Sequence, residues 1–377
     1  MKVMVTGGAG FIGSWLVESL VSQDFTVYVV DSFSKQIHDD VTPETIAGLQ
    51  RRHGCEFIHA DIRDMSTVEN VLAKVEVVVH LAAETGTGQS MYQIGHYCEV
   101  NHQATAAMLE AIATRHRQIR NVVLASSRAV YGEGAYRSGD KLVVPGPRDS
   151  KRMKRGLFEV VGSAGEPLEV VATPEDVSLC PASIYAATKV GNEHVGRICA
   201  DAFGLQVTAL RFQNVYGERQ SFRNPYTGIL SAFANRMRQD LEINIFEDGL
   251  ESRDFVHVAD AVSAIELAIN RRSPGYRVYN VGSGVRTSIM DVAAELKRLT
   301  GSKAELKITG DFRVGDIRHC YADLGAARKE LGYRPRVALK DGLERLVGWV
   351  MTQPVSEDQS SKASAELSKF GLGFSHS

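Results

Sequence analysis

The stretch VTGGAGFIG, residues 5–13, joins a run of strand-forming residues to an amphipathic, helix-forming run. Gly7, Gly10 and Gly13 are spaced G-x-x-G-x-x-G, between the predicted end of the strand and the start of the helix. In such a turn, backbone N–H groups and the partial positive charge of a helix N-terminus face an anion. We assign the tight turn to Gly7, the close approach of a pyrophosphate to Gly10 and the helix–strand contact to Gly13. The alternative is a purely structural turn.

A carboxylate stands at the end of the next apolar run, TVYVVD, where Asp31 is the last residue. A carboxylate there accepts hydrogen bonds from the adenosine ribose and repels a 2′-phosphate, which favours NAD over NADP. Strand, turn, helix, strand and acid therefore follow one another as in a dinucleotide-binding unit. In HADIRD (59–64), Asp61 and Ile62 fall at the end of a third strand, where they flank the adenine. For Asp61 an ordinary turn cap is an equal alternative.

Short β-branched runs alternate with helical stretches along the first 212 residues. The runs are KVMVTG (2–7), TVYVVD (26–31), CEFIHAD (55–61), VEVVVHLAA (75–83), NVVLASS (121–127) and VTALRF (207–212). Several are apolar at consecutive positions, which is typical of strands buried on both faces. We therefore predict an α/β protein with a Rossmann-type doubly wound parallel sheet and a smaller C-terminal substrate-binding domain.

The pattern divides the chain into a nucleotide-binding domain over 1–215 and a substrate domain over 216–352, from which RDFVHVADAV and YRVYNVGSG return to the first. An excursion over 135–180 interrupts the first domain. Its basic cluster SKRMKRG (150–156) is interpreted as a solvated loop face rather than a site for a phosphorylated ligand. Residues 353–377 are polar and serine-rich, and we predict a disordered or loosely attached tail.

The bulk composition excludes several classes of protein. The chain has 43 Lys and Arg against 45 Asp and Glu, which gives no general attraction to nucleic acid or to anionic membranes. Its longest apolar run is far shorter than a membrane span, and no signal peptide precedes the first strand-like run. The five cysteines are scattered without metal-ligand spacing. We therefore expect a soluble cytoplasmic protein with reduced thiols and no metal site.

A tyrosine and a lysine share one face of the predicted helix over 184–203. Tyr185 and Lys189 are four residues apart. A free phenol, with a pKa of about 10, is a poor base, but a nearby ammonium and an oxidised nicotinamide favour the phenolate, which then takes a proton from a sugar hydroxyl. Ser126 or Ser127, at the end of the fifth strand, hydrogen-bonds the reacting oxygen; the alternative is a serine that caps the turn.

Eight segments in order resemble the extended short-chain dehydrogenase/reductase family, specifically its nucleotide-sugar epimerases and dehydratases. The segments are TGGAGFIG, HLAAE, SSRAVYG, YAATK, LRFQNVYG, RDFVHVAD, NVGSG and RVGDIRHCYAD, and the match runs from residue 1 to about 350. The resemblance implies a catalytic trio of Ser127, Tyr185 and Lys189. Ser127 is chosen over Ser126 because the family's hydroxyl residue lies four positions before the tyrosine of the VYG segment.

The resemblance also extends the two binding sets. Ala82 and Ala83 match alanines that line the cofactor. The full predicted set for NAD is Gly7, Gly10, Phe11, Ile12, Gly13, Asp31, Asp61, Ile62, Leu81, Ala82, Ala83, Asn101, Tyr185 and Lys189. Asn214, Arg253 and Arg313 match positions that bind the substrate diphosphate. The full predicted substrate set is Ser127, Arg128, Asn214, Arg253 and Arg313. An arginine pair suits two phosphates, although Arg253 is equally interpreted as a surface ion-pair partner.

The residues after Ser127 discriminate among the family's reactions. Its 4,6-dehydratases carry an acidic pair there, whereas this chain has Arg128 and Ala129. We therefore favour an NAD-dependent nucleotide-sugar 4-epimerase that forms a transient 4-keto sugar. The segments HLAAETGTGQSMYQ, SSRAVYGEG and NPYTGIL most resemble a subgroup with dTDP-L-rhamnose 4-epimerase activity, which makes dTDP-6-deoxy-L-talose and belongs to deoxysugar biosynthesis.

Other functions fit the same residues less well. A nucleotide-4-keto-sugar reductase or a UDP-hexose 4-epimerase would use the same trio. A non-catalytic NAD-binding regulator is disfavoured because such relatives lose the tyrosine or the lysine. The helices near 101–116 and 185–203 resemble the four-helix dimer contact of the family and imply a homodimer; the alternative is that their apolar faces form intrachain core.

Overall fold

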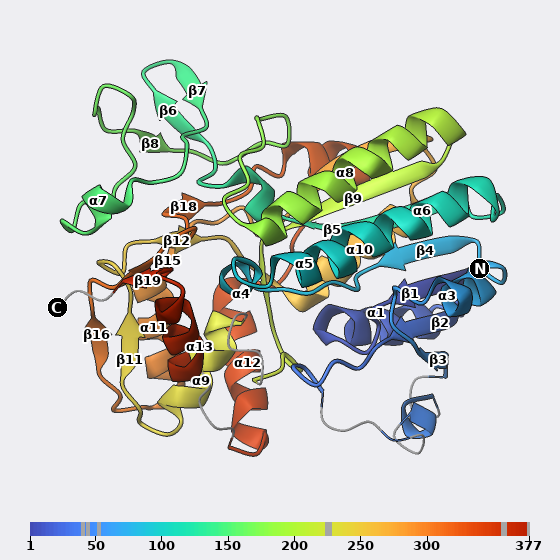
Figure 1. The fold of residues 1–377 in the computed structure, drawn as a ribbon. Helices are drawn as coiled ribbons and strands as arrows, with labels where there is room; N and C mark the ends of the chain where they lie inside the picture. The colour runs from blue at the N-terminus through green and yellow to red at the C-terminus, as the bar shows by residue number, and fades with distance from the viewer. Residues whose placement is uncertain (39–41, 43–45, 51–53, 223–227, 356–359, 375–377) are drawn as a thin grey trace.

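The computed structural model describes residues 1–38, 42, 46–50, 54–222, 228–355 and 360–374. Its centre is a seven-stranded parallel sheet in the order β14-β9-β5-β4-β1-β2-β3 (Figure 1). The strands are β1 (Lys2–Thr6), β2 (Thr26–Asp31), β3 (Glu56–His59), β4 (Val77–His80), β5 (Asn121–Ser127), β9 (Gln206–Phe212) and β14 (Gly275–Val281). The strand order reverses between β1 and β4, so that a crevice opens at the carboxyl edge there.

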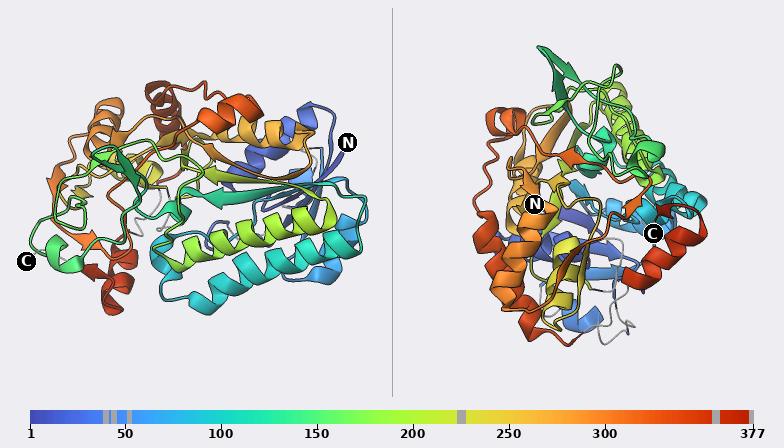
Figure 2. Two further views of the ribbon diagram at one scale, coloured as in Figure 1. Left: turned by 90° about the horizontal axis from the view of Figure 1, so that it is seen from above. Right: turned by 90° about the vertical axis from the view of Figure 1, so that its left-hand side faces the viewer.

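Side chains of the central strands alternate between two cores. Val3 and Val5 of β1 pack with α1 (Phe11–Ser22) and α10 (Val258–Asn270) on one face. Met4 packs on the other face, whose helices are α3 (Met65–Leu72), α6 (Ala104–Thr114) and α8 (Ile184–Phe203). Because both faces are buried, the strands read as unbroken apolar runs. Figure 2 shows α6 and α8 side by side over the sheet. The predicted doubly wound fold is confirmed.

A third core lies beyond the carboxyl edge of the sheet. It is built by α9 (Ile229–Met237), α11 (Ile289–Thr300), α12 (Leu339–Thr352), β11 (Ile243–Ile245) and β16 (Leu306–Ile308). Short strands connect it to the large sheet: β10 (Asn214–Tyr216), β12 (Ser252–Arg253), β13 (Phe255–His257), β15 (Thr287–Ser288) and β18 (His319–Cys320). The chain returns to the large sheet through α10 and then β14. In the described part of the chain, no helix combines the length and apolarity that crossing a membrane requires.

The excursion carries its own small sheet. The elements are β6 (Tyr136–Ser138), β7 (Lys141–Val143), β8 (Glu169–Val170) and α7 (Ser150–Met153). Arg148 is buried and pairs with Glu133 at 2.9 Å and with Glu247 at 2.8 Å. Because a buried guanidinium is stabilised only when it is well paired, this residue fastens the excursion to the third core. Lys151 and Lys154 of the basic cluster are exposed.

The C-terminal tail differs from the disorder expected for it, over residues 360–374. It forms α13 (Ser360–Lys369) and β19 (Gly373–Phe374), and β19 pairs antiparallel with β17 (Phe312–Arg313). Leu367 is buried, and Phe370 stacks on Tyr92 with 4.8 Å between ring centroids. A few apolar side chains with distant partners therefore order a segment whose average composition is polar.

Candidate active site

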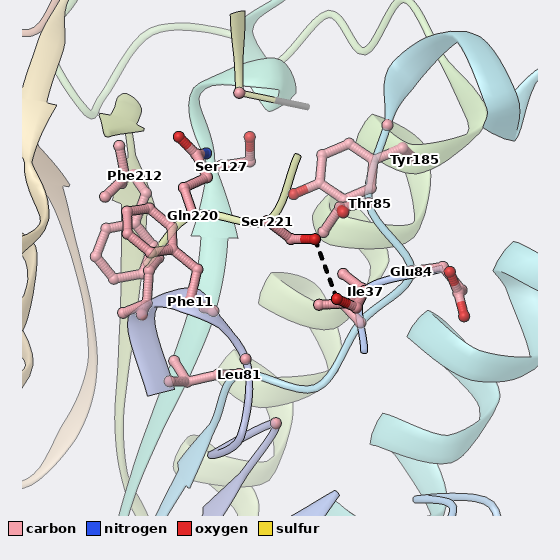
Figure 3. Close-up of a pocket in the computed structure, with 18 of the residues that line it drawn as sticks. Phe11, Ile37, Leu81, Glu84, Thr85, Ser127, Tyr185, Phe212, Gln220 and Ser221 are labelled. Carbon is pink, nitrogen blue, oxygen red and sulfur yellow. Dashed lines mark hydrogen bonds between the residues drawn. The ribbon is translucent and has the colours of Figure 1, made fainter. Parts of the chain in front are cut away.

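A cavity of about 1130 Å³ lies between the carboxyl edge of the sheet and the third core. Figure 3 shows its middle, where the hydroxyl of Tyr185 points into the cavity on the side of Ser127. Open α/β sheets bind ligands at this edge. Apart from Asn101, every residue of the two predicted binding sets lines the cavity.

The glycine turn forms one end of the cavity. Gly7 has a φ of +69°, and a Cβ there would lie 2.8 Å from the backbone nitrogen of Ala82. A Cβ on Gly13 would lie 2.2 Å from the carbonyl oxygen of Gly7. Gly10 precedes α1 and provides no side-chain cap, so the first N–H groups of the helix are left for a ligand. A dinucleotide pyrophosphate fits this turn.

Two carboxylates line the cavity beyond the turn. Asp31 ends β2 and accepts hydrogen bonds from the backbone nitrogens of Ala9 at 2.9 Å and Phe33 at 2.8 Å. These bonds fix its oxygens beside the turn, where the two hydroxyls of a ribose can donate to them. Asp61 instead pairs with Arg63 at 2.8 Å, and the side-chain hydrogen bond from Arg63 lowers the pKa of Asp61.

Asn101 lies behind the cavity wall rather than on it. Its Oδ1 accepts from the backbone nitrogen of Glu84 at 2.8 Å, and its Nδ2 donates to the carbonyl of Glu84 at 3.0 Å. Nδ2 also lies 3.3 Å from the hydroxyl of Thr188 on α8. In the structure its amide therefore supports the loop after β4, and its contact with the cofactor stays a prediction. Since an extended loop has free backbone groups, a buried amide satisfies two of them at once.

The tyrosine and lysine of α8 meet at the centre of the cavity. The hydroxyl of Ser183 accepts from the backbone nitrogen of Ala186 and caps the helix. Lys189 Nζ lies 5.7 Å from the ring centroid of Tyr185 and donates to the carbonyl of Ala125 at 2.9 Å. Burial lowers the pKa of Lys189 to about 8. Burial also raises the pKa of Tyr185. The hydrogen bond from the Ser127 hydroxyl and the charge of Arg128 lower this pKa and partly offset the effect of burial.

The two serines after β5 have different partners. The hydroxyl of Ser126 donates to Glu193 at 2.5 Å, and Glu193 also pairs with Arg211 at 2.7 Å. Ser126 is therefore engaged in a buried network. The hydroxyl of Ser127 accepts from the backbone nitrogen of Ala129 at 3.2 Å and keeps its proton for another acceptor. This arrangement favours Ser127 as the predicted partner of the reacting oxygen.

Lys189→Met is expected to stabilise the NAD-free protein at pH 7 by about 2 kcal/mol, because it removes a buried ammonium. Unfolded lysine binds a proton up to a pH of about 10.4, whereas folded Lys189 loses it near pH 8. The free energy of unfolding of the wild type therefore rises as the pH increases from about 8 to about 10.4. Over this range the difference in stability between the variant and the wild type becomes smaller. Urea unfolding at pH 7 and pH 9.5 measures this. Lys74→Met, at an exposed lysine, serves as the control; a variant less stable than the wild type at pH 7 contradicts the expectation.

The opposite end of the cavity is cationic. Arg253 donates to the carbonyls of Arg318 at 2.9 Å and Ile317 at 2.7 Å, which holds its guanidinium in place without an ion pair among the described residues. Arg313 donates to Asp316 at 2.9 Å, and its guanidinium carbon lies 4.8 Å from the ring centroid of Phe246. Arginines fixed in this way suit the oxygens of a diphosphate.

The C-terminal tail supports the backbone of Arg313. Arg313 in β17 stands opposite Gly373 in β19, and the two strands pair antiparallel. We expect a chain that ends at Val355 to bind UDP and dTDP about 10-fold more weakly, as the loss of one well-held charged contact implies. Its NAD content is expected to stay at the wild-type level, because the tail does not line the glycine turn. Calorimetry measures the affinities, and a thermal unfolding scan tests that the shortened chain is folded. Unchanged affinities for both nucleotides contradict a supporting role.

The residues that line the cavity without having been predicted include Glu84, Thr85, Gln220 and Ser221 (Figure 3). Glu84 and Thr85 directly follow HLAA, the segment at the carboxyl end of a strand. Their position in the sequence could therefore have predicted that they line a ligand site. Gln220 and Ser221 lie in a loop after β10 without a recognisable motif. The hydroxyl of Ser221 donates to the carbonyl of Ile37 at 3.0 Å, a contact between distant parts of the chain.

The sheet, the glycine turn and the two-ended cavity define a dinucleotide-binding protein of the doubly wound α/β class. The NAD dependent epimerase/dehydratase family model matches residues 3–150 and 158–282, which is more than half of the chain. The chain belongs to this family of NAD-dependent enzymes. The predicted family, enzyme class and NAD cofactor are confirmed.

The relatives of this chain include several epimerases. A dTDP-L-rhamnose 4-epimerase of Burkholderia thailandensis is 35% identical over 352 residues, which cover 93% of this chain and 94% of that protein. A UDP-glucose 4-epimerase structure from Thermotoga maritima with UDP-glucose superposes with a TM-score of 0.75 at 29% identity, and covers 93% of this chain and 99% of the other. A UDP-glucuronic acid 4-epimerase structure from Bacillus cereus with UDP-glucuronic acid and NAD gives a TM-score of 0.75 at 28% identity, with the same coverage.

Proposed function

We propose that this chain is an NAD-dependent nucleotide-sugar 4-epimerase. The observation that carries the proposal is that Tyr185 and Ser127 line the same cavity as the dinucleotide turn and a fixed pair of arginines. The residues after Ser127 are Arg128 and Ala129, which provide no acid for the elimination of water. Similarity to proteins described as 4-epimerases supports the same reaction.

The proposed reaction distributes its steps over this chain's own residues. Tyr185 takes the proton of the sugar's 4-hydroxyl and later returns it to the same oxygen, while Ser127 donates a hydrogen bond to that oxygen. Bound NAD supplies the hydride acceptor and donor. Arg253, Arg313 and Asn214 hold the diphosphate while the 4-keto sugar turns to present its other face. Since oxidation and reduction cancel, no cofactor is consumed.

For the substrate we propose dTDP-L-rhamnose and its 4-epimer dTDP-6-deoxy-L-talose, and hence a role in deoxysugar biosynthesis. The 35% identity to the Burkholderia thailandensis dTDP-L-rhamnose 4-epimerase supports this choice. UDP-sugars are the competing class, because the UDP-glucose and UDP-glucuronic acid 4-epimerases superpose on this chain.

The test is incubation of the purified protein with UDP-, dTDP- and GDP-sugars without added cofactor, followed by NMR of the sugar protons. An equilibrium mixture of two 4-epimers is expected from dTDP-L-rhamnose. Conversion that requires added NADH contradicts epimerisation and indicates a 4-ketoreductase. A 4-keto-6-deoxy product indicates a dehydratase.

We also propose a homodimer built on α6 and α8. Ile198 and Phe203 on α8 are more than half exposed, and Ile94 on the adjoining α5 (Ile94–Tyr97) is 51% exposed. Such residues on neighbouring helices suit a face covered by a second copy. Analytical ultracentrifugation is expected to give a dimer for the wild type and a monomer for Ile198→Asp. Val285→Asp, at an equally exposed residue elsewhere, is expected to stay dimeric.

A cytoplasmic location is part of the same proposal. All five cysteines are unpaired, and one of them, Cys98, is exposed. Unpaired thiols suit a reducing compartment.

A further inference from the structure

Arg128 is a cation of the cavity wall, and no described residue serves as its counter-ion. It begins a single helical turn, Arg128–Tyr131, directly after β5. Its Nε donates to Oδ1 of Asn214 at 2.8 Å. Within the described ranges this is its one hydrogen bond, and no carboxylate comes within ion-pair distance of it. Its terminal nitrogens have no hydrogen-bond partner in the described part of the chain, and the residue lines the cavity.

Three arginines with buried side chains outside the cavity are treated differently. Arg148, Arg211 and Arg318 each pair with glutamate at 2.9 Å or less. An enclosed guanidinium without such a partner is costly. Burial and the neighbouring charge of Arg253 lower the pKa of Arg128 to about 10, which reports the same penalty. A guanidinium that lines the cavity and bears this free-energy penalty provides a binding site for an anionic group of a ligand.

The position of Arg128 indicates which group it meets. On one side it follows Ser127 and acts electrostatically on the phenol of Tyr185. On the other side it bonds to Asn214 and shares the cavity with Arg253, whose charge acts on it; both are proposed diphosphate residues. The part of a nucleotide sugar between its diphosphate and its reacting carbon is the phosphate that carries the sugar.

We infer that Arg128 binds the phosphate that carries the sugar and places its positive charge between that phosphate and the phenol of Tyr185. This inference rests on the proposed function and adds a positioning residue to it. A diphosphate brings negative charge toward a phenol that must itself become negative, and such like-charge pairing raises the pKa of an acid. Arg128 offsets that effect, so that anchoring of the substrate does not impair the base.

Three variants separate binding from the electrostatic role. Arg128→Gln keeps a polar side chain without the charge, and we expect it to raise KM about 10- to 100-fold, as loss of a charge-assisted contact implies. It is also expected to move the acidic limb of the kcat–pH profile to higher pH, because Tyr185 then ionises later. Arg128→Lys keeps the positive charge but loses the paired N–H donors of the guanidinium. We therefore expect KM to rise while the kcat–pH profile stays at the wild-type position. Arg313→Gln is the matched control, with a raised KM and an unmoved profile.

A readout independent of turnover keeps the test valid if the proposed reaction is wrong. UDP and dTDP are titrated into the NAD-loaded protein by calorimetry. The phenolate of Tyr185 is followed as the ultraviolet difference between the chain and its Tyr185→Phe variant over pH. Weaker nucleotide binding together with later ionisation in Arg128→Gln supports the inference even without epimerisation. Wild-type affinity, or an unmoved phenolate titration, overturns it.

Two further outcomes are distinguished by the same variants. The anionic oxygen could belong to a sugar carboxylate instead of the phosphate; Arg128→Gln would then impair UDP-glucuronic acid alone and leave nucleotide hexoses unaffected, which contradicts the phosphate assignment. A merely structural role for Arg128 would lower the thermal unfolding midpoint of Arg128→Gln. We expect no decrease, because the variant removes a partly buried charge that has no ion-pair partner among the described residues.

Discussion

Tyr185→Phe is expected to lower turnover about 1000-fold and to leave NAD bound. The change removes one oxygen, so the proton of the sugar hydroxyl has no acceptor, and general acid–base groups contribute effects of this order. The ring itself remains, with Lys189 Nζ 5.7 Å from its centroid in the wild type. NMR of the sugar protons measures turnover, and the absorbance of the cofactor released by denaturation measures NAD content.

Tyr28→Phe is the matched control for that experiment. Tyr28 lies on β2 and also has a lysine over its ring, with Lys74 Nζ 5.4 Å from the centroid, but it does not line the cavity. Its loss is expected to leave turnover within about 2-fold of the wild type, as for a surface change. Near-normal turnover in Tyr185→Phe would mean that another group carries the proton. Loss of NAD in that variant would mean that the phenol serves binding rather than chemistry.

The sequence predicted those parts of the site that lie at strand ends. Gly7, Asp31, Ala82 and Ser127 lie at the carboxyl ends of four different strands, and all of them line one cavity. The carboxyl ends of parallel strands meet at one edge, so the position of each residue along its strand was sufficient. The order of apolar runs predicted the sheet for the same reason, since strands buried on both faces are apolar at consecutive positions.

Features that depend on contacts between distant segments could not be predicted in this way. The hydrogen bonds of the Asn101 amide to the backbone of Glu84 join two such segments and have no signal in the local sequence. The ordering of the tail depends on Leu367 and Phe374, whose partners lie elsewhere in the chain. Analysis of a short stretch of sequence detects only that the composition of the tail is polar on average. The tertiary contacts of a few apolar side chains nevertheless order the segment.

For Arg128, one property could be predicted from the sequence and another could not. Its sequence position identified it as the residue that replaces an acid, and therefore as evidence about the reaction. That no described carboxylate pairs with it follows only from the three-dimensional structure, because a carboxylate distant in sequence, such as the partners of Arg318, could have neutralised it. Charge balance within a cavity is a property of the fold, not of a motif.

Gly13→Ala is expected to have the opposite effect to Tyr185→Phe, with loss of the cofactor before any effect on chemistry. A Cβ on Gly13 would meet the carbonyl oxygen of Gly7 at 2.2 Å and the Cα of Gly8 at 2.6 Å. Both are backbone atoms of the turn, so the turn must open and the pyrophosphate site is lost. We expect at least a 100-fold weaker affinity for NAD and a free energy of unfolding lower by about 1–3 kcal/mol, as for an overpacked site.

Gly95→Ala is the control for the added methyl group. Gly95 lies in α5, and a Cβ there would meet no atom within 4 Å. Because alanine is favoured over glycine in a helix by about 1 kcal/mol, this variant is expected to be at least as stable as the wild type and to keep its NAD. Calorimetric titration of the NAD-free proteins with NAD, together with urea unfolding, measures both quantities. Wild-type NAD affinity in Gly13→Ala would show that the dinucleotide does not lie against the turn, whereas a loss of affinity there but not in Gly95→Ala locates the cofactor between α1 and the end of β1.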